Sequence, residues 1–401
     1  MIIMVLNSGS SSVKYQLFNI DKEEVLAKGI VERIGLDGSR LKHVTEKKDL
    51  FIELEINDHD EAIELILKVL VDEDYGVINN ITEIKAVGHR VVHGGEYFTE
   101  SSLITEDVMK ILEECIPLAP LHNPANIMGI KAMSKILPEI PQVAVFDTSF
   151  HQTIPNYAFL YAIPYEFYEK QKIRRYGFHG TSHRYVSKRA AQLAKIDYNK
   201  AKIISAHLGN GASITAISGG KSMDTSMGYT PLEGLVMGTR SGDIDPAILV
   251  ALLREKKMSA TSIDNLLNKK SGVLGISGIS SDMRDLEKAA ANGEKRAELA
   301  LTIYAYRLKK YIGAYLAVLG GADLLVFTGG IGENSFFIRE KALEGLDFFG
   351  IILDKEKNKK AKKKEVDISA EESKVKILVV PTNEELVIAR DTREIIEREV
   401  K

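Results

Sequence analysis

The chain has 401 residues, a length typical of two domains, and ordinary proportions of hydrophobic (45%) and charged (27%) residues. A formal charge of −3 gives no reason to expect a nucleic-acid partner, and apolar runs of only strand length give none to expect a membrane span. Cys115 is the single cysteine, which excludes an intrachain disulfide and a cysteine-based zinc site. Because residues 1–5 also lack the basic start of a signal peptide, we expect a cytoplasmic location.

The first half of the sequence is β-rich at its start and then alternates helices with strands. Strands are expected near residues 2–7, 12–19, 25–33, 50–56, 83–93 and 142–146. Helices are expected near residues 58–71, 105–116 and 123–137. Asp58 or Asp60 and Thr105 are suitable caps for the first two helices, and Asn123 followed by Pro124 is a typical start for the third.

The second half repeats this arrangement. Strands are expected as a pair around residues 203–217 and near 324–327 and 376–380. Helices are expected after Ser182, at several places within 244–345 including a long one at 294–319, from Asn334 or Ser335, and from Glu384 onward. A β-meander followed by alternating helices and strands therefore occurs twice, which predicts α/β domains with mixed sheets. The lysine-rich run at 355–364 is expected to be a solvated helix or loop and not a phosphate-binding segment.

A short motif supports this internal repeat. Residues 7–14 read NSGSSSVK and residues 207–215 read HLGNGASIT, each after an apolar strand. In the overlay Ser12 falls on Ser213 and Val13 on Ile214. Most turns of glycine, serine and asparagine are only turns, but such a turn can also present backbone N–H groups to an anion. The duplication and a third glycine-rich turn at 329–334 favour two related domains that grip one phosphate-bearing ligand.

Further candidates lie beside these turns, since the sequence contains neither a P-loop nor a Rossmann glycine motif. Lys14 follows the first turn and is either a phosphate contact or a surface residue. Arg90, near the end of an apolar strand, suits a carboxylate or phosphate, and its alternative is a structural ion pair. Asp147 ends another apolar strand, where a carboxylate commonly holds magnesium or acts as a base; its alternative is a turn cap.

Two cation-rich segments complete the candidates. Residues 174–183 combine arginines, aromatics, glycines and histidines just before an expected helix, a mixture that suits an anion at a helix N-terminus. Any single histidine there is more often structural. Residues 238–243, GTRSGD, place Arg240 between glycines, where it is either solvated or close to a ligand.

These segments together resemble the acetate kinase family. The matching segments are NSGSSSVK at 7–14, RYGFHGTSH at 175–183, HLGNG at 207–211, FTGGIGEN at 327–334 and PTNEE at 381–385. They occur in the family's order and span nearly the whole chain. The resemblance implies two duplicated ribonuclease H-like domains of the sugar kinase, chaperone and actin superfamily, with a nucleotide cleft between them. It places the domains at 1–149 with 385–401 and at 150–384.

The resemblance also implies a reaction. The family transfers the γ-phosphoryl group of ATP to acetate, reversibly and in line, to give acetyl phosphate and ADP, with Mg²⁺ or alternatively Mn²⁺. A homodimer joined through the C-terminal domains is implied as well. We further expect the two halves to close on the nucleotide, with hinges near residues 146–150 and 381–384.

The site residues that the resemblance implies fall into four groups. The catalytic group is Asp147, His179 and Arg240. The acetate group is Arg90 with the pocket residues Val92, Leu121, His122, Phe178 and Pro231. The nucleotide group is Ser10, Ser12, Lys14, His207, Leu208, Gly209, Asn210, Gly211, Asp282, Met283, Arg284, Gly330, Ile331, Gly332, Glu333 and Asn334. The metal group is Asn7 and Glu384.

The role of Asp147 is open to a chemical argument. Acetate has a pKa of roughly 4 to 5, like a glutamate side chain, so at neutral pH it carries no proton for a base to remove. The usual assignment of Asp147 as an acid or base is therefore unnecessary. We hypothesise that Asp147 instead organises magnesium and its waters.

Three alternatives remain at the level of sequence. A propionate or butyrate kinase differs by one or two methylenes, which an apolar pocket discriminates by only ~1–3 kcal/mol each. An actin-like or chaperone-like protein would use ATP to change conformation, but it would not need Arg90, Arg240 and His179 as a clamp for a carboxylate. A catalytically silent binding protein would not need the complete set of charged residues.

Overall fold

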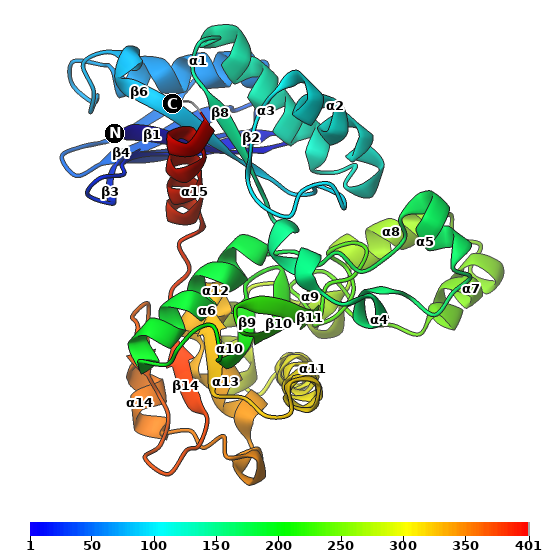
Figure 1. The fold of residues 1–401 in the computed structure, drawn as a ribbon. Coiled ribbons are helices and arrows are strands. Elements are labelled where there is room, and N and C mark those ends of the chain that lie inside the picture. Colours follow the sequence, from blue (N-terminus) through cyan, green and yellow to red (C-terminus); the bar gives the residue numbers. More distant parts are fainter. Residues whose placement is uncertain (400–401) are drawn as a thin grey trace. The chain divides into compact units, whose positions relative to one another are not determined.

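The computed structural model describes residues 1–399, which form two compact units (Figure 1). The first unit contains Met1–Ser149 and the segment from Asn383 onward, and the second contains Phe150–Thr382. The chain therefore passes from one unit to the other twice. The second passage precedes Asn383 and Glu384, whereas the predicted boundary followed Glu384. The Asn383 side chain accepts a hydrogen bond from the Leu386 backbone N–H and so belongs to the start of the last helix.

An eight-stranded mixed sheet forms the centre of the first unit. Its strands are β1 (Ile2–Gly9), β2 (Ser12–Asn19), β3 (Glu24–Glu32), β4 (Arg40–Thr45), β5 (Asp49–Glu53), β6 (Ile84–Val91), β7 (Ser102–Leu103) and β8 (Gln142–Phe146), in the order β5-β4-β3-β2-β1-β6-β8-β7. Strands β1 to β5 form an antiparallel meander, β6 and β8 continue it in parallel, and β7 closes the edge antiparallel to β8.

Helices cover the two faces of this sheet. They are α1 (His59–Leu70), α2 (Glu106–Glu114), α3 (Asn123–Ile136) and α15 (Glu384–Glu399), with short 3₁₀ turns at Ile81–Glu83 and Ile116–Leu118. On one face, Ile63 and Ile66 of α1 and Met133 of α3 pack against the sheet. On the other, α15 packs against β1, β6 and β8 through Leu386 and Ile388. The apolar periodicity of α15 therefore places the C-terminal helix on the N-terminal sheet.

The second unit repeats the sheet. Its strands are β9 (Lys202–Leu208), β10 (Ala212–Ser218), β11 (Lys221–Thr225), β12 (Leu324–Thr328), β13 (Val366–Asp367) and β14 (Lys376–Val379), in the order β11-β10-β9-β12-β14-β13. The order β11-β10-β9-β12-β14 corresponds to β3-β2-β1-β6-β8, with the same parallel and antiparallel pairings. The predicted fold class, two duplicated α/β halves with mixed sheets, is confirmed.

The helices of the second unit lie around this sheet and in the segments between its strands. They are α4 (Asn156–Phe159), α5 (Glu166–Gln171), α6 (Gly180–Ala194), α7 (Pro246–Glu255), α8 (Ala260–Lys269), α9 (Gly272–Ser277), α10 (Met283–Ala291), α11 (Lys295–Leu319), α12 (Gly329–Asn334), α13 (Phe336–Leu343) and α14 (Lys355–Lys360), with 3₁₀ turns at Ser149–Thr153 and Asp347–Phe349. No helix in the described part of the chain is both long and apolar enough to cross a membrane.

Several local predictions were wrong. The structure adds β4, β7, β11 and β13 to the predicted strands, and the strand predicted at 50–56 ends at Glu53. The glycine-rich segment predicted as a turn forms the short helix α12. The cap position of α3 is His122, and Asn123 is the first helical residue, because its side chain bonds instead to the backbone of His93. Helix α6 begins at Gly180, before the predicted start.

We predict that Gly88 is essential to the packing of α15 on the sheet. A Cβ atom at this position of β6 would lie 2.3 Å from Thr392 Oγ1 and 2.6 Å from Ile388 Cγ2. Gly88→Ala should therefore lower the free energy of unfolding by about 1–3 kcal/mol, the usual cost of overpacking. Gly313→Ala is the control, because a Cβ there meets no atom within 4 Å and a helical alanine is favoured by about 0.5–1 kcal/mol. Denaturant titration measures the free energy of unfolding of both variants. A value for Gly88→Ala equal to that of the parent protein would contradict the prediction.

Candidate active site

A bidentate ion pair lies at the ends of two parallel strands in the first unit. Arg90 of β6 is paired with Val145 of β8, so Asp147, two residues further along, lies just past the end of the neighbouring strand. Arg90 Nε donates to Asp147 Oδ1 at 3.0 Å and Nη2 donates to Oδ2 at 2.6 Å. The Asp147 side chain is 3% exposed, whereas that of Arg90 is 26% exposed. The ion pair considered as an alternative for Arg90 is thus present, and the Arg90 side chain remains partly exposed.

Glu384, the first residue of α15, adds a second carboxylate to this region. Burial raises the pKa of Glu384 to about 7; Arg90 and Lys14 oppose the shift, and Asp147 reinforces it. Asn7 and Lys14 pair across β1 and β2, and both line a hollow of about 290 Å³ with Glu385. The structure therefore brings the predicted metal residues close to the predicted acetate and phosphate contacts of the first unit.

These oxygen donors fit magnesium. In the described residues, no group of three histidine, cysteine or carboxylate side chains is arranged to hold a metal unaided. Mg²⁺ prefers oxygen ligands, and in nucleotide enzymes it is usually held by one or two carboxylates together with substrate phosphates and water. A partly buried carboxylate at Glu384 and an amide at Asn7 match that pattern.

Two asparagines of α3 hold the end of β6 in place. The backbone N–H of Val92 donates to Asn126 Oδ1, and Asn126 Nδ2 donates to the carbonyl of Ser8 at the end of β1. Asn123 in turn bonds to both backbone groups of His93. Sequence reasoning had missed both positioning roles. The available signal was the placement of two asparagines three residues apart on a helix.

The remaining predicted residues of the first unit differ in exposure. Val92 is buried, but Leu121 is 64% exposed and His122 is exposed beside it. Leu121 therefore does not line a closed apolar pocket within this unit. Ser10 is exposed in the two-residue turn between β1 and β2, and Ser12 pairs with Gly9 at its base.

In the second unit, His179, Arg240 and the turn between β9 and β10 meet. His179 precedes α6 with a left-handed backbone (φ +56°), and its Nδ1 is hydrogen-bonded to Ser213 Oγ at 2.9 Å. A Cβ atom on Gly211 would lie 3.4 Å from Arg240 Nη1 and 3.6 Å from His179 Nε2. The imidazole of His179 also stacks on that of His207, with 4.2 Å between ring centroids.

Arg240 is a half-buried cation without a counter-charge. In the part of the chain that the structure describes, its side chain donates to the Pro231 carbonyl at 3.2 Å and contacts the Met237 sulfur, and neither partner is a carboxylate. Burial lowers the pKa of Arg240, but an arginine stays charged at neutral pH. A buried charge is costly unless it is paired. Arg240 is therefore suited to receive an anionic ligand.

The histidines behind this cluster are structural. His183 is fully buried and is hydrogen-bonded to Ser205 and Ser213. Burial lowers its pKa well below the ordinary value and lowers the pKa of His151 to about 4, so both are neutral at physiological pH. His151 Nε2 bonds to the carbonyl of Phe178, a buried residue, and so supports the backbone immediately before His179.

A cavity of about 780 Å³ gathers three of the predicted nucleotide segments. Its lining includes Gly209, Asn210, Asp282, Met283, Arg284, Gly330, Ile331 and Asn334. It also includes residues that sequence reasoning missed: Ser281, Glu287, Ser335, Phe336, Lys362 and Lys363.

Three predicted nucleotide residues do not line the cavity and instead contact the segments around it. Leu208 is fully buried, the Gly332 carbonyl accepts from Arg339, and Glu333 Oε1 accepts from the backbone N–H groups of Gly329 and Thr382. Their contacts hold the ends of β9, β12 and β14 together.

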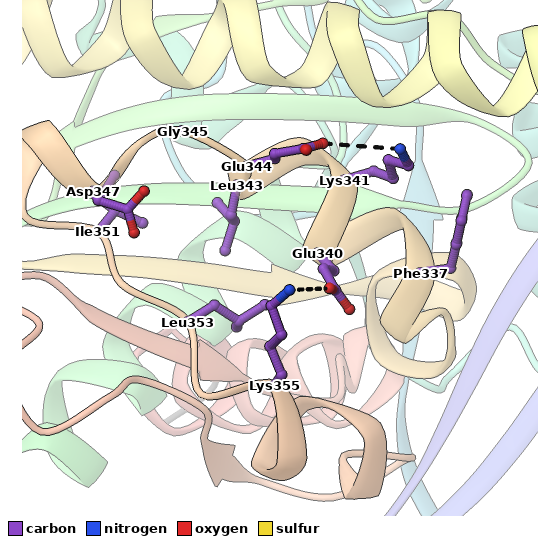
Figure 2. Close-up of a pocket in the computed structure, with 10 residues that line it drawn as sticks. All are labelled: Phe337, Glu340, Lys341, Leu343, Glu344, Gly345, Asp347, Ile351, Leu353 and Lys355. Atoms are coloured by element: carbon purple, nitrogen blue, oxygen red, sulfur yellow. Dashed lines mark ion pairs between the residues drawn. The ribbon is translucent and has the colours of Figure 1, made fainter.

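A different hollow, of about 360 Å³, lies beside α13 (Figure 2). Two ion pairs border it, Lys355–Glu340 at 2.9 Å and Lys341–Glu344 at 3.8 Å. None of the predicted site residues lines it, so it is separate from the candidate site.

Comparison with known proteins identifies close relatives. Residues 2–390 match the model of the acetokinase family. The chain is 60% identical to the acetate kinase of Thermoanaerobacterium thermosaccharolyticum over 398 residues, covering 99% of each chain. The crystal structure of Porphyromonas gingivalis acetate kinase superimposes with a TM-score of 0.96 at 54% identity, covering 98% of this chain and 99% of that one. A propionate kinase from Francisella tularensis gives a TM-score of 0.92 at 46% identity, covering 98% and 100%.

We predict that the Glu384 carboxylate destabilises the ligand-free protein at alkaline pH. Its folded-state pKa of about 7 lies above the ordinary value of 4.5, so between these pH values the folded state binds a proton that the unfolded state lacks. Stability from this group is therefore lost as pH rises through that window. Glu384→Gln should raise the melting temperature by a few degrees at pH 8 and only slightly at pH 5, without metal or nucleotide. Glu394→Gln, exposed on the same helix, is the control, and an equal effect at both pH values would refute the prediction.

Proposed function

The chain belongs to the acetokinase family, and we propose that it catalyses the reversible transfer of the γ-phosphoryl group of ATP to acetate, giving acetyl phosphate and ADP. The family assignment supports the kinase reaction. The observation that carries the chemistry is Arg240, a half-buried cation without a carboxylate partner, beside His179 and the turn at Gly211. A protein that used ATP only to change conformation would not need Arg90 as a cationic contact for a carboxylate substrate.

The second unit would bind the nucleotide. The cavity of about 780 Å³ is large enough for a nucleotide and is lined by the predicted nucleotide contacts from Asp282 to Arg284. Gly209 and Asn210 on the same wall offer an unobstructed turn for the phosphates. Arg240 and His179 would stabilise the negative charge that spreads over the transferred group, since electrostatic stabilisation dominates phosphoryl transfer.

The first unit would hold the metal and the carboxylate substrate. Glu384 and Asn7 would hold Mg²⁺, which would neutralise charge on the phosphates when bound; Mn²⁺ is an alternative. Arg90 would bind acetate through the guanidinium edge not used by Asp147. Val92, which is buried two residues after Arg90, would contribute to the apolar part of the acetate pocket.

The geometry of Asp147 favours an organising role over that of a base. Both carboxylate oxygens accept N–H groups from Arg90, and the side chain is almost completely buried. Acetate needs no base. Asp147 would therefore fix the guanidinium of Arg90 and contribute negative charge near the metal site, which agrees with the magnesium hypothesis.

Acid preference, assembly and location are also matters of proposal. Because one methylene changes binding by only ~1–3 kcal/mol, we expect some activity with propionate, as the likeness to a propionate kinase also suggests. We propose a homodimer in the cytoplasm. The exposed apolar side chains of Leu299, Tyr306 and Val318 on α11 support a contact surface there, which light scattering of the purified protein would test.

The proposed function is tested by acyl-hydroxamate formation with Mg-ATP, hydroxylamine and acetate, propionate or butyrate in parallel. Product that depends on acetate would support a carboxylate kinase, and the ratio among the acids would define the pocket. Release of ADP without hydroxamate would contradict the proposal and favour an ATP-driven conformational protein.

We predict that Asp147→Asn lowers the apparent affinity for magnesium as well as the reaction rate. Loss of a carboxylate behind a metal site typically costs about 10–100-fold in metal affinity or activity. Initial rates over a range of Mg²⁺ concentrations should therefore show a higher half-saturating concentration. Asp107→Asn, on an exposed carboxylate of α2, should leave both values unchanged. A lower rate with unaltered magnesium dependence would refute the organising role.

A further inference from the structure

Two lysines of the run that we expected to be solvated, Lys362 and Lys363, are exposed as predicted and also line the nucleotide cavity. Helix α14 ends at Lys360, and Lys362 and Lys363 follow it. Both line the cavity of about 780 Å³, together with Gly209 and Asn210. Neither belongs to the segments that carry the family resemblance.

A buried arginine fixes the start of this lysine segment. Arg339 of α13 is fully buried and donates four hydrogen bonds. Nη1 bonds to the carbonyl of Gly332 in α12, Nε bonds to the side chain of Asn358, and Nη2 bonds to the carbonyls of Asn358 and Ala361. The residue directly before Lys362 is thus tied to the glycine-rich helix that forms another wall of the cavity.

The other end of the segment is fixed as well. Glu365 accepts two hydrogen bonds from Arg189 of α6, at 2.6 and 2.7 Å, in a bidentate ion pair. Lys363 has a left-handed backbone (φ +48°), which is uncommon for a residue other than glycine. Its charge also partly offsets the effect of burial on the pKa of Glu333. Only three lysines lie between the two anchors, so their backbone has a defined place beside the cavity.

The charge balance of the cavity depends on these lysines. Its other ionisable lining residues are Asp282, Arg284 and Glu287, of which Asp282 and Arg284 form an ion pair. Those three groups leave one net negative charge, and the two lysines turn it into one net positive charge. ATP and ADP are anions even with magnesium bound. Without the lysines, the nucleotide would enter a cavity of like charge.

We propose that Lys362 and Lys363 contact the polyphosphate of the bound nucleotide and supply the positive charge on which nucleotide affinity depends. The inference rests on the proposed function, since it takes the cavity as the nucleotide site. It assigns the two lysines to binding and not to the chemical step. Adenosine, which carries no phosphate, gains nothing from them.

The test is calorimetric titration of Mg-ADP and of adenosine into the full-length protein. The variant is Lys362→Gln with Lys363→Gln, and its control is Lys359→Gln with Lys360→Gln, which removes the same charge from residues of the same run that do not line the cavity. The cavity variant should bind Mg-ADP about tenfold more weakly and with a smaller salt dependence, since the lost attraction is electrostatic. Adenosine binding should not change, KM for ATP should rise, and kcat should stay the same.

The outcomes separate this inference from the proposed function. Mg-ADP affinity equal to that of the control would overturn the inference, and so would an equal loss for Mg-ADP and adenosine, which would indicate a disturbed cavity. Restored affinity in Lys362→Arg with Lys363→Arg would support a role of charge. The proposed function would remain intact if the parent protein bound Mg-ADP and made acetyl hydroxamate while the cavity variant bound Mg-ADP as tightly as the parent. A parent that binds no nucleotide would overturn both.

Discussion

The three parallel strands at the centre of each sheet are largely buried on both faces, and this constraint decides where chemistry is possible. Every residue of β8 and of β12 is buried. Polar groups cannot lie within such strands without large cost, so they gather where the strands end. Asp147 follows β8 in the first unit, and Gly209 follows β9 in the second. Pairing between strands therefore sets the position of the reacting groups.

Three arginines differ in what surrounds their charge. Arg90 forms a bidentate ion pair with the Asp147 carboxylate, which raises the pKa of Arg90. Arg339 has only amide and carbonyl oxygens around it, and burial lowers its pKa to about 10. Arg240 has neither arrangement. The first is positioned, the second holds segments of the fold together, and the third retains an unsatisfied charge for a ligand.

Much of the fold could be predicted from the sequence, because apolar periodicity and caps are local signals. Asp58, Thr105 and Ser335 cap helices as their positions suggested. Strands β4 and β11 were missed because they are short and alternate with charged or polar residues, which makes them resemble loops. The repeat was visible in the turn motifs, but the equivalence of the two sheets became visible only in the strand order.

The candidate site was predictable where its residues lie in motifs, and less so where contacts join distant segments. The exposure of Leu121 depends on the chain path before α3, which has no sequence signal. The contribution of Lys362 and Lys363 depends on Arg339, more than twenty residues earlier, and on Arg189, which lies on another helix. The lysines are exposed, as the sequence indicated, but their place beside the cavity could not be predicted without these anchors.

The double passage of the chain between its units has a consequence for its synthesis. The second unit is one continuous stretch, Phe150–Thr382, so its residues are translated in one uninterrupted series. The first unit begins at Met1 but packs Leu386, Ile388 and Ile395 of α15 into its core. Since domains generally fold as units during translation, the second unit has all of its residues before the first. The face of the N-terminal sheet that α15 covers therefore stays uncovered until α15 has been translated.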